Sequence, residues 1–163
     1  MAPAQASLLA KLDTQERVRD FLTNAVASGR ASHAYLFLGA PGAGKLDAAW
    51  ALAQAFLCEQ DGCGACDSCV RVARHTHPDV HYYTPESATG YLIAQTRELL
   101  DDVPLAPIRA KAKVYIIDRA EQLRANTANA LLKTLEEPPE GVMSILLGTS
   151  ADVMLPTIVS RCQ

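Results

Sequence analysis

The sequence predicts one α/β domain in which a parallel sheet carries helices on both faces. Three apolar runs, 34–38, 114–117 and 144–147, have the composition of buried strands, and helical patterns separate them. The first run leads through a glycine-rich turn into an alanine-rich helix, and the second closes on Asp118. Strands buried on both faces read as continuous apolar runs, and ligands bind at their carboxyl ends.

The length and net charge of the chain limit which classes of protein it can belong to. A chain of 163 residues has the length of about one domain, so 1–163 is treated as one unit. A net charge of −3 gives no global basic field for nucleic acid or membrane. The N-terminal segment does not read as a signal peptide, and no apolar run approaches a membrane span. We therefore expect a cytoplasmic protein without a membrane partner, whose cysteines are thiols or metal ligands rather than disulfides.

The turn after the first apolar run has the pattern of a phosphate-binding loop. Its glycines let backbone N–H groups point at an anion, and the helix that follows adds its positive N-terminal end. Lys45 would reach the β- and γ-phosphates of a nucleotide. The predicted nucleotide-binding residues are Gly39, Pro41, Gly42, Ala43, Gly44 and Lys45.

The same loop departs from the pattern at its last position. Ser or Thr should follow the lysine and hold Mg²⁺, but Leu46 stands there and offers no oxygen ligand. The loop is therefore predicted to cradle phosphate and to be poorly equipped to hydrolyse it. The alternative is a glycine-rich turn without a ligand, and whether ATP is bound at all stays open.

Four cysteines within twelve residues predict a metal centre. Zn²⁺ takes four soft ligands in a tetrahedron, and the glycines between the cysteines permit the tight turns that bring the thiols together. A closed set of four leaves no open coordination position, so the zinc would be structural, in a module at about 58–74. The alternative is four buried free thiols. The predicted ligands are Cys58, Cys63, Cys66 and Cys69.

The remaining elements follow from periodicity and capping signals. Asp13 and Glu16 form a capping-box pattern at the start of an amphipathic helix that ends near Gly29. Asn126 is the expected cap of a later helix. His75 and His77 are expected to end a short helix rather than to bind metal. The expected helices are 13–29, 45–57, 67–74, 91–101 and 126–138, and a further strand is 80–83.

Asp118 is a candidate metal-binding acid, because it ends a buried strand at the edge where a nucleotide site would form. In nucleoside triphosphatases of this kind, a glutamate directly after such an aspartate polarises the attacking water. Arg119 occupies that position here. This second departure agrees with Leu46. The alternative is an ordinary aspartate at a strand end.

Taken together, these motifs resemble the ATPase-type domain of bacterial DNA polymerase III clamp-loader subunits. The matching stretches are His33-Ala-Tyr-Leu-Phe, the phosphate loop, the four-cysteine insert, His77-Pro-Asp79, Val-Tyr-Ile-Ile-Asp118, Asn129-Ala-Leu-Leu-Lys-Thr-Leu-Glu-Glu-Pro-Pro139 and Ser160-Arg161-Cys162. The resemblance covers the chain from His33 to its end. It implies an AAA+ core, a P-loop α/β sheet with a zinc module inserted after the loop helix.

Two subunit types share these motifs. The gamma/tau motor type carries an intact Lys-Ser/Thr loop and an Asp-Glu pair, whereas the delta-prime type has degraded versions and keeps Ser-Arg-Cys. Leu46 and Arg119 resemble the second type. The resemblance then implies a largely non-hydrolysing stator in a five-subunit ring that contains motor and delta-type subunits and loads the sliding clamp on primer-template DNA. Arg161 would act in trans as an arginine finger, and Asp118 would be a remnant of the metal-binding acid.

The resemblance also implies that a last core strand, a helical lid and a helical collar are absent from this chain. Two rival readings remain. One is an active ATPase motor subunit with an atypical loop, in which water replaces the missing hydroxyl. The other is a P-loop kinase of a small metabolite, which explains neither the cysteine module nor the Ser-Arg-Cys end.

Overall fold

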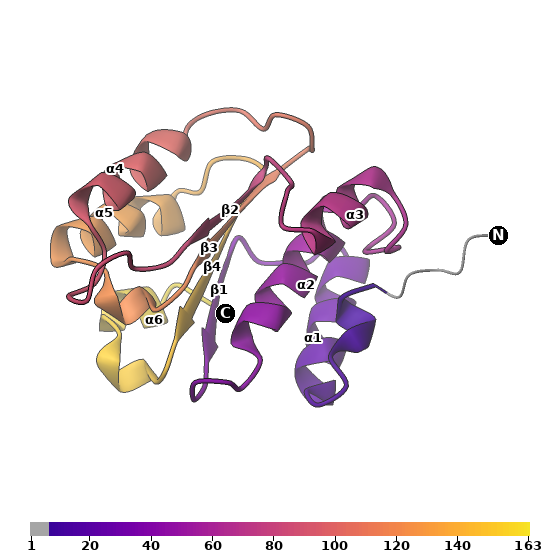
Figure 1. Ribbon diagram of the computed structural model, residues 1–163, viewed down its shortest axis with the longest axis horizontal. Coiled ribbons are helices and arrows are strands. Elements are labelled where there is room, and N and C mark those ends of the chain that lie inside the picture. The colour runs from indigo at the N-terminus through magenta and orange to yellow at the C-terminus, as the bar shows by residue number, and fades with distance from the viewer. Residues whose placement is uncertain (1–6) are drawn as a thin grey trace.

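The computed structural model describes residues 7–163 and shows a parallel sheet between two layers of helices (Figure 1). The strands are β1 (Ala34–Leu38), β2 (Val80–Tyr83), β3 (Lys113–Ile117) and β4 (Val142–Gly148). The helices are α1 (Glu16–Ala27), α2 (Lys45–Leu57), α3 (Asp67–Ala73), α4 (Ile93–Asp102), α5 (Ala125–Glu136) and α6 (Pro156–Val159). Short 3₁₀ turns span Leu9–Lys11, Ala120–Gln122 and Ala151–Val153. The predicted fold class is confirmed.

The sheet has the order β1-β4-β3-β2, and every neighbouring pair is parallel. This order puts the carboxyl ends of β1, β4 and β3 side by side, because parallel strands end at the same edge. The outer edge of β1 pairs with the last residue: the Leu36 N–H donates to the Gln163 carbonyl at 2.9 Å, and the Gln163 N–H donates to the Ala34 carbonyl at 3.0 Å. All residues of β3 and β4 are buried, as their continuous apolar runs predict.

Two apolar cores lie on the two faces of the sheet. Helices α1, α2 and α3 cover one face, and α4, α5 and α6 cover the other (Figure 1). The first core is rich in alanine and is formed mostly by α2, whose residues 48–53 are all buried. The small alanine side chain lets this helix approach the strands closely, and alanine has the highest intrinsic helix propensity. The phosphate loop is therefore held between the edge strand β1 and a nearly fully buried helix.

The cysteine-bearing segment is fastened to α2 by polar and close contacts. Gln54 is 2% exposed, and its side-chain amide donates to the Cys69 carbonyl at 3.0 Å while its oxygen accepts from the Leu8 N–H at 2.8 Å. Gly62 has φ of +94°, and a Cβ there would lie 3.3 Å from the Ala55 Cα. The module is thus packed on the core rather than extended into solvent.

A buried aspartate fixes the loop before β3. Asp79 is fully buried, and its carboxylate accepts backbone N–H groups from Ile108 at 2.5 Å, Arg109 at 2.7 Å and Ala110 at 2.7 Å. Burial opposes ionisation, but these three donors outweigh it and lower the pKa of Asp79. Its own N–H donates to Nδ1 of the buried His77 at 3.0 Å. The predicted stretch His77-Pro-Asp79 is therefore a structural anchor.

Both predicted helix caps are wrong by position. The first helix begins at Glu16 after Gln15, not at Asp13, and the Gln15 side chain donates to the Ala43 carbonyl at 3.0 Å instead of capping the helix. The later helix begins at Ala125, so Asn126 lies inside it and accepts from the next N–H at 2.9 Å. Tertiary contacts set these helix starts, whereas the capping pattern describes local preference alone.

The other predicted elements match within two residues at each end, and strands 34–38 and 80–83 and helix 45–57 match at both ends. Within residues 7–163, no helix is both long enough and apolar enough to span a bilayer. His75 terminates α3 in a left-handed conformation with φ of +56°. His77 lies beyond that end and is buried, which corrects the expectation that both histidines end the helix.

Candidate functional site

The phosphate loop lies between the end of β1 and the start of α2. Gly42 and Gly44 have φ of +81° and +91°, and Gly44 is the residue before the first helical residue, Lys45. Positive φ at alternate positions turns successive N–H groups toward one side, which forms a concave anion site at the positive end of a helix. The local geometry therefore fits a phosphate group.

Lys45 is engaged by backbone carbonyl groups in this structure. Its Nζ donates to the carbonyl of Gly39 at 2.6 Å and to that of Gly148, the last residue of β4, at 3.0 Å. An ammonium has three donors, so one remains for a ligand. Lys45 is thus aimed across the strand ends, where a phosphate on the loop would lie.

A cleft of about 540 Å³ opens at the carboxyl ends of β1, β3 and β4. Residues from the phosphate loop and from the ends of β3 and β4 meet in it. Both departures from the nucleotidase pattern, Leu46 and Arg119, line this one cleft. The other lining residues are Pro41, Gly42, Gly44, Lys45, Asp47, Asp118, Glu121, Gln122, Leu147, Gly148 and Thr149.

Two predicted residues lie elsewhere. Gly39 is behind the loop with its carbonyl on Lys45, and Ala43 lines a separate hollow of about 230 Å³ with Gln15 and Phe37. Gly39 and Ala43 therefore shape the loop rather than face the cleft, and nucleotide binding by the loop stays a prediction.

Asp118 is a hydrogen-bond acceptor at both carboxylate oxygens. Tyr82, on the neighbouring β2, donates its hydroxyl to Oδ2 at 2.9 Å, and the Arg119 N–H donates to Oδ1 at 2.8 Å. Tyr91 donates to the Asp118 carbonyl and to the Tyr83 carbonyl. Burial, followed by the hydrogen bond to Asp118, raises the pKa of Tyr82, so the phenol keeps its proton and stays a donor.

At positions 46 and 119 the cleft has neither the hydroxyl that would hold magnesium nor the carboxylate that would activate water. Leu46 is partly buried against the α2 core and has no oxygen. Arg119 adopts a left-handed conformation with φ of +46° and brings positive charge to the place of the expected carboxylate. Glu121 also lines the cleft, and its Oε2 is enclosed without a hydrogen-bond partner among the described residues.

The four predicted zinc ligands come together. The Sγ atoms of Cys58, Cys63, Cys66 and Cys69 all lie within 4.8 Å of one another. The Cys63–Cys69 and Cys66–Cys58 Sγ pairs are 4.0 and 3.8 Å apart. Zn–S bonds of about 2.3 Å in a tetrahedron separate the sulfurs by about 3.8 Å. The donor set and its spacing fit one Zn²⁺, and neither His75 nor His77 belongs to the cluster.

Backbone N–H groups point at these sulfurs and stabilise negative charge on them. Cys66 caps α3, because its Sγ accepts from the Cys69 N–H. The N–H groups of Ala65 and Cys66 lower the pKa of Cys63 to about 6. Burial opposes ionisation of Cys58, but N–H donors led by that of Cys63 outweigh it and lower its pKa. Burial raises the pKa of Cys66 and of Cys69. Thiolates are the form that binds metal, so the cluster is partly prepared for it.

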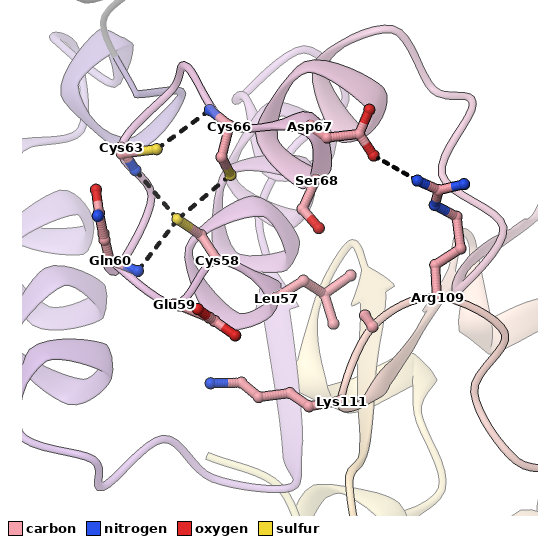
Figure 2. A pocket seen from close by; sticks show the side chains of 11 residues that line it. Leu57, Cys58, Glu59, Gln60, Cys63, Cys66, Asp67, Ser68, Arg109 and Lys111 are labelled. Carbon is pink, nitrogen blue, oxygen red and sulfur yellow. Dashed lines mark hydrogen bonds and ion pairs between the residues drawn. The ribbon is translucent and has the colours of Figure 1, made fainter.

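A hollow of about 310 Å³ lies between the cysteine cluster and the loop before β3 (Figure 2). Arg109 and Lys111 reach into it from the loop, and the Arg109 guanidinium pairs with the Asp67 carboxylate at 2.9 Å. Asp67 also pairs with Arg71 at 2.9 Å. These contacts join α3 to the loop that Asp79 anchors. All partners are substantially exposed, so the pairs position the module more than they stabilise it.

Arg161 lies just after α6, away from the residues that line its own phosphate cleft. Its guanidinium pairs with the Glu136 carboxylate at 2.6 Å and donates to the Thr157 carbonyl and the Ser160 hydroxyl, both at 3.3 Å. The side chain is 36% exposed. Arg161 is therefore accessible to another molecule, and the nearby Cys162 is partly buried outside the cysteine cluster, with a pKa raised to about 11 by burial.

Sequence reasoning missed several residues of the site. Tyr82 was read as part of a short strand, but its hydroxyl holds Asp118. Glu121 and Gln122 belong to a 3₁₀ turn that returns them to the cleft. The strand order places Tyr82 beside Asp118, because β2 lies beside β3, and a single sequence gives no signal for that order.

A family model described as DNA polymerase III, delta subunit, matches residues 14–163. The delta' subunit of DNA polymerase III from Bacillus subtilis is 41% identical over 93% of this chain, and the tau subunit from Escherichia coli is 42% identical over 91%. The chain spans 46% of the first relative and 23% of the second.

Solved structures agree on the fold. A DNA polymerase III gamma subunit-related protein from Thermotoga maritima aligns with a TM-score of 0.62 at 22% identity, over 88% of this chain and 43% of that one. The branch migration motor RuvB of the same organism aligns with a TM-score of 0.56 at 18% identity, over 97% and 46%. At these identities the likeness concerns the fold alone. Because the family model matches residues 14–163, the chain belongs to the DNA polymerase III delta-subunit family, a family of AAA+ clamp-loader subunits.

Proposed function

We propose that this chain is a delta-prime-type stator: a largely non-hydrolysing clamp-loader subunit that acts in DNA replication. The observation that carries the proposal is that Leu46 and Arg119 line one cleft. The first removes the hydroxyl that would hold magnesium, and the second replaces the carboxylate that would activate water. Loss of both from a single site leaves no ready route to hydrolysis, while the loop and Lys45 can still hold phosphate.

We further propose that Arg161 serves the ATP of a neighbouring motor subunit, and its position supports this role. Arg161 lies apart from the chain's own cleft, and its guanidinium forms an ion pair with the exposed carboxylate of Glu136. A planar guanidinium suits the stabilisation of charge on a phosphoryl group in transfer. An incoming phosphate can compete for a guanidinium whose present ion pair is exposed and weak.

The test is hydrolysis by the isolated full-length chain. We expect its ATP turnover to equal that of a Lys45→Ala variant, because no positioned metal and water exist to be lost. Phosphate release from highly purified protein measures both. Turnover in the wild type that Lys45→Ala removes would contradict the stator proposal and favour an active motor subunit with an atypical loop.

That motor alternative has support of its own. The delta' and tau relatives are almost equally identical to this chain, so overall similarity does not separate the two types. Leu46 and Arg119 are the residues that favour the stator. Similarity to DNA polymerase III subunits argues against the third reading, a small-metabolite kinase.

The proposal extends to partners and to the rest of the protein. We infer a cytoplasmic hetero-pentameric ring with motor and delta-type subunits, which meets primer-template DNA as an assembly. We also infer a last core strand, a lid and a collar beyond the described fold. The relatives are about twice as long or more, which supports these inferences. For the cleft, we propose that it can bind ATP without hydrolysing it.

For the cysteine cluster we propose one structural Zn²⁺, held by Cys58, Cys63, Cys66 and Cys69. Four protein thiolates leave no open position for chemistry. The ion would hold together a segment that is too short to bury a core of its own, since α3 has only seven residues.

Removal of this metal should loosen the module and spare the core. Cys66→Ser, or a chelator, is expected to speed proteolysis and amide exchange in 58–74 while far-ultraviolet dichroism stays close to that of the wild type. The reason is that α2 and the sheet bury their own apolar faces. Cys162→Ser, outside the cluster, is the matched control and should retain the metal, measured by dye-detected zinc release. Global unfolding of the metal-free domain would refute this expectation.

A further inference from the structure

We propose that the cysteine module braces the phosphate cleft, and that His75, Trp50 and Tyr82 are the positioning residues through which it holds Asp118. The proposal gives the module a role beyond its own stability. It is independent of the function proposed for Arg161, because it concerns the chain's own cleft.

The first contact joins the module to α2. His75 ends α3, and its ring stacks on the Trp50 indole with centroids 3.9 Å apart and planes 10° apart. His75 is held in a left-handed conformation, φ +56°, which is uncommon for a residue with a side chain. Cys66 and Cys69 belong to the cap and first turn of the same helix. The metal centre therefore fixes the helix that presents His75.

The second contact joins α2 to the sheet. Trp50 is 6% exposed and lies five residues after Lys45 on the buried helix. Its ring meets that of Tyr82 with centroids 6.1 Å apart and planes at 45°, a favourable tilted arrangement. Tyr82 is 38% exposed, and among the described residues the aromatic ring that packs against it is that of Trp50.

The third contact reaches the cleft. The Tyr82 hydroxyl donates to Asp118 Oδ2 at 2.9 Å, and Oδ1 accepts the Arg119 N–H at 2.8 Å. The carboxylate is thereby oriented from two sides, and the second bond stabilises the left-handed turn at Arg119. A loss of the Tyr82 donor frees the carboxylate to rotate and weakens the turn that shapes one wall of the cleft.

The test is hydrogen exchange, followed by mass spectrometry, on peptides that cover 115–123 of the full-length protein. Tyr82→Phe removes only the hydroxyl, and it should speed exchange in that segment by about fivefold, the effect expected for one lost hydrogen bond. Peptides from β4 are the internal reference and should not change. A change that affects all peptides equally would indicate general destabilisation and overturn the proposed brace.

Two variants at His75 separate the ring from the backbone. His75→Asn keeps a residue that accepts the left-handed conformation but removes the stacked ring, whereas His75→Phe keeps a ring. We expect faster exchange in 115–123 for His75→Asn and exchange close to that of the wild type for His75→Phe. Equal behaviour of the two variants would contradict the stacking role.

A third experiment removes the metal and uses the fluorescence of the chain's single tryptophan, Trp50, as a probe. Chelation should change Trp50 fluorescence and speed exchange in 115–123, and added Zn²⁺ should reverse both. In Tyr82→Phe the fluorescence change should persist, because the stack of His75 on Trp50 does not involve the Tyr82 hydroxyl. A chelation effect confined to 58–74 would overturn the brace. Absence of any metal effect would refute the zinc site, while the metal-independent variants would still decide the contacts.

Discussion

Arg161→Ala is expected to lower ATP turnover at the neighbouring motor site by roughly 10³-fold in a reconstituted ring, with assembly unchanged. Arginine fingers supplied in trans contribute about 10³–10⁵ in rate, and the lower figure is expected at the one site that Arg161 serves. Other interfaces of the ring continue to turn over, so the phosphate release of the whole ring should fall by the share of that one site. Assembly should survive because, among residues 7–163, Arg161 makes one ion pair, and that pair is exposed and weak. Steady-state phosphate release and gel filtration of the same ring provide the two measurements.

Two further variants make this prediction specific. Arg161→Lys keeps the positive charge but loses the planar fork, so it should restore only part of the turnover. Glu136→Gln removes the carboxylate that now holds the guanidinium and leaves the finger intact, so turnover should stay near that of the wild type. Unchanged turnover in Arg161→Ala would remove the finger assignment.

The second large effect concerns folding. Asp79→Asn is expected to reduce the free energy of unfolding by about 3 kcal/mol, since it removes a buried carboxylate that accepts three backbone N–H groups. An asparagine side chain has only one oxygen acceptor, so it can accept only some of these three hydrogen bonds. Urea unfolding at neutral pH measures the change. Asp13→Asn is the matched control, because Asp13 is exposed and caps no helix, and it should change stability by less than about 0.5 kcal/mol.

The pH dependence of the same variant has a definite sign. The pKa of Asp79 is lowered in the folded chain, so its stabilisation is present above the unfolded pKa and is lost as pH falls through the folded pKa. Stability of the wild type should therefore fall more steeply below about pH 4 than that of Asp79→Asn. Parallel pH profiles for the two proteins would contradict the anchor role.

The strands, the glycine-rich loop and the cysteine cluster were predictable because their signals are local. Continuous apolar runs marked β1, β3 and β4, and the glycine spacing marked a loop that does place Lys45 across the strand ends. The cysteine spacing likewise predicted a cluster whose sulfurs converge. In each case the residues that carry the function lie within a few positions of one another.

The contacts that join these stretches were not predictable from one sequence. Tyr82 reaches Asp118 because β2 lies beside β3, and Gln54 joins the module to α2 because the chain folds back over that helix. Asp13 and Asn126 also show that local sequence patterns do not fix tertiary contacts. Each has a good local capping pattern, but contacts elsewhere, such as that of Gln15 with the phosphate loop, decide where the helix begins.

The central claim is that this chain contributes to ATP hydrolysis in trans and not at its own cleft. The most direct measurement compares rings assembled with the wild-type chain, with Lys45→Ala and with Arg161→Ala, at equal subunit concentrations. Our account predicts that Lys45→Ala leaves the ATP turnover of the ring unchanged and that Arg161→Ala lowers it. The reverse pattern, in which turnover depends on Lys45 and not on Arg161, would contradict the account and identify the chain as a motor subunit.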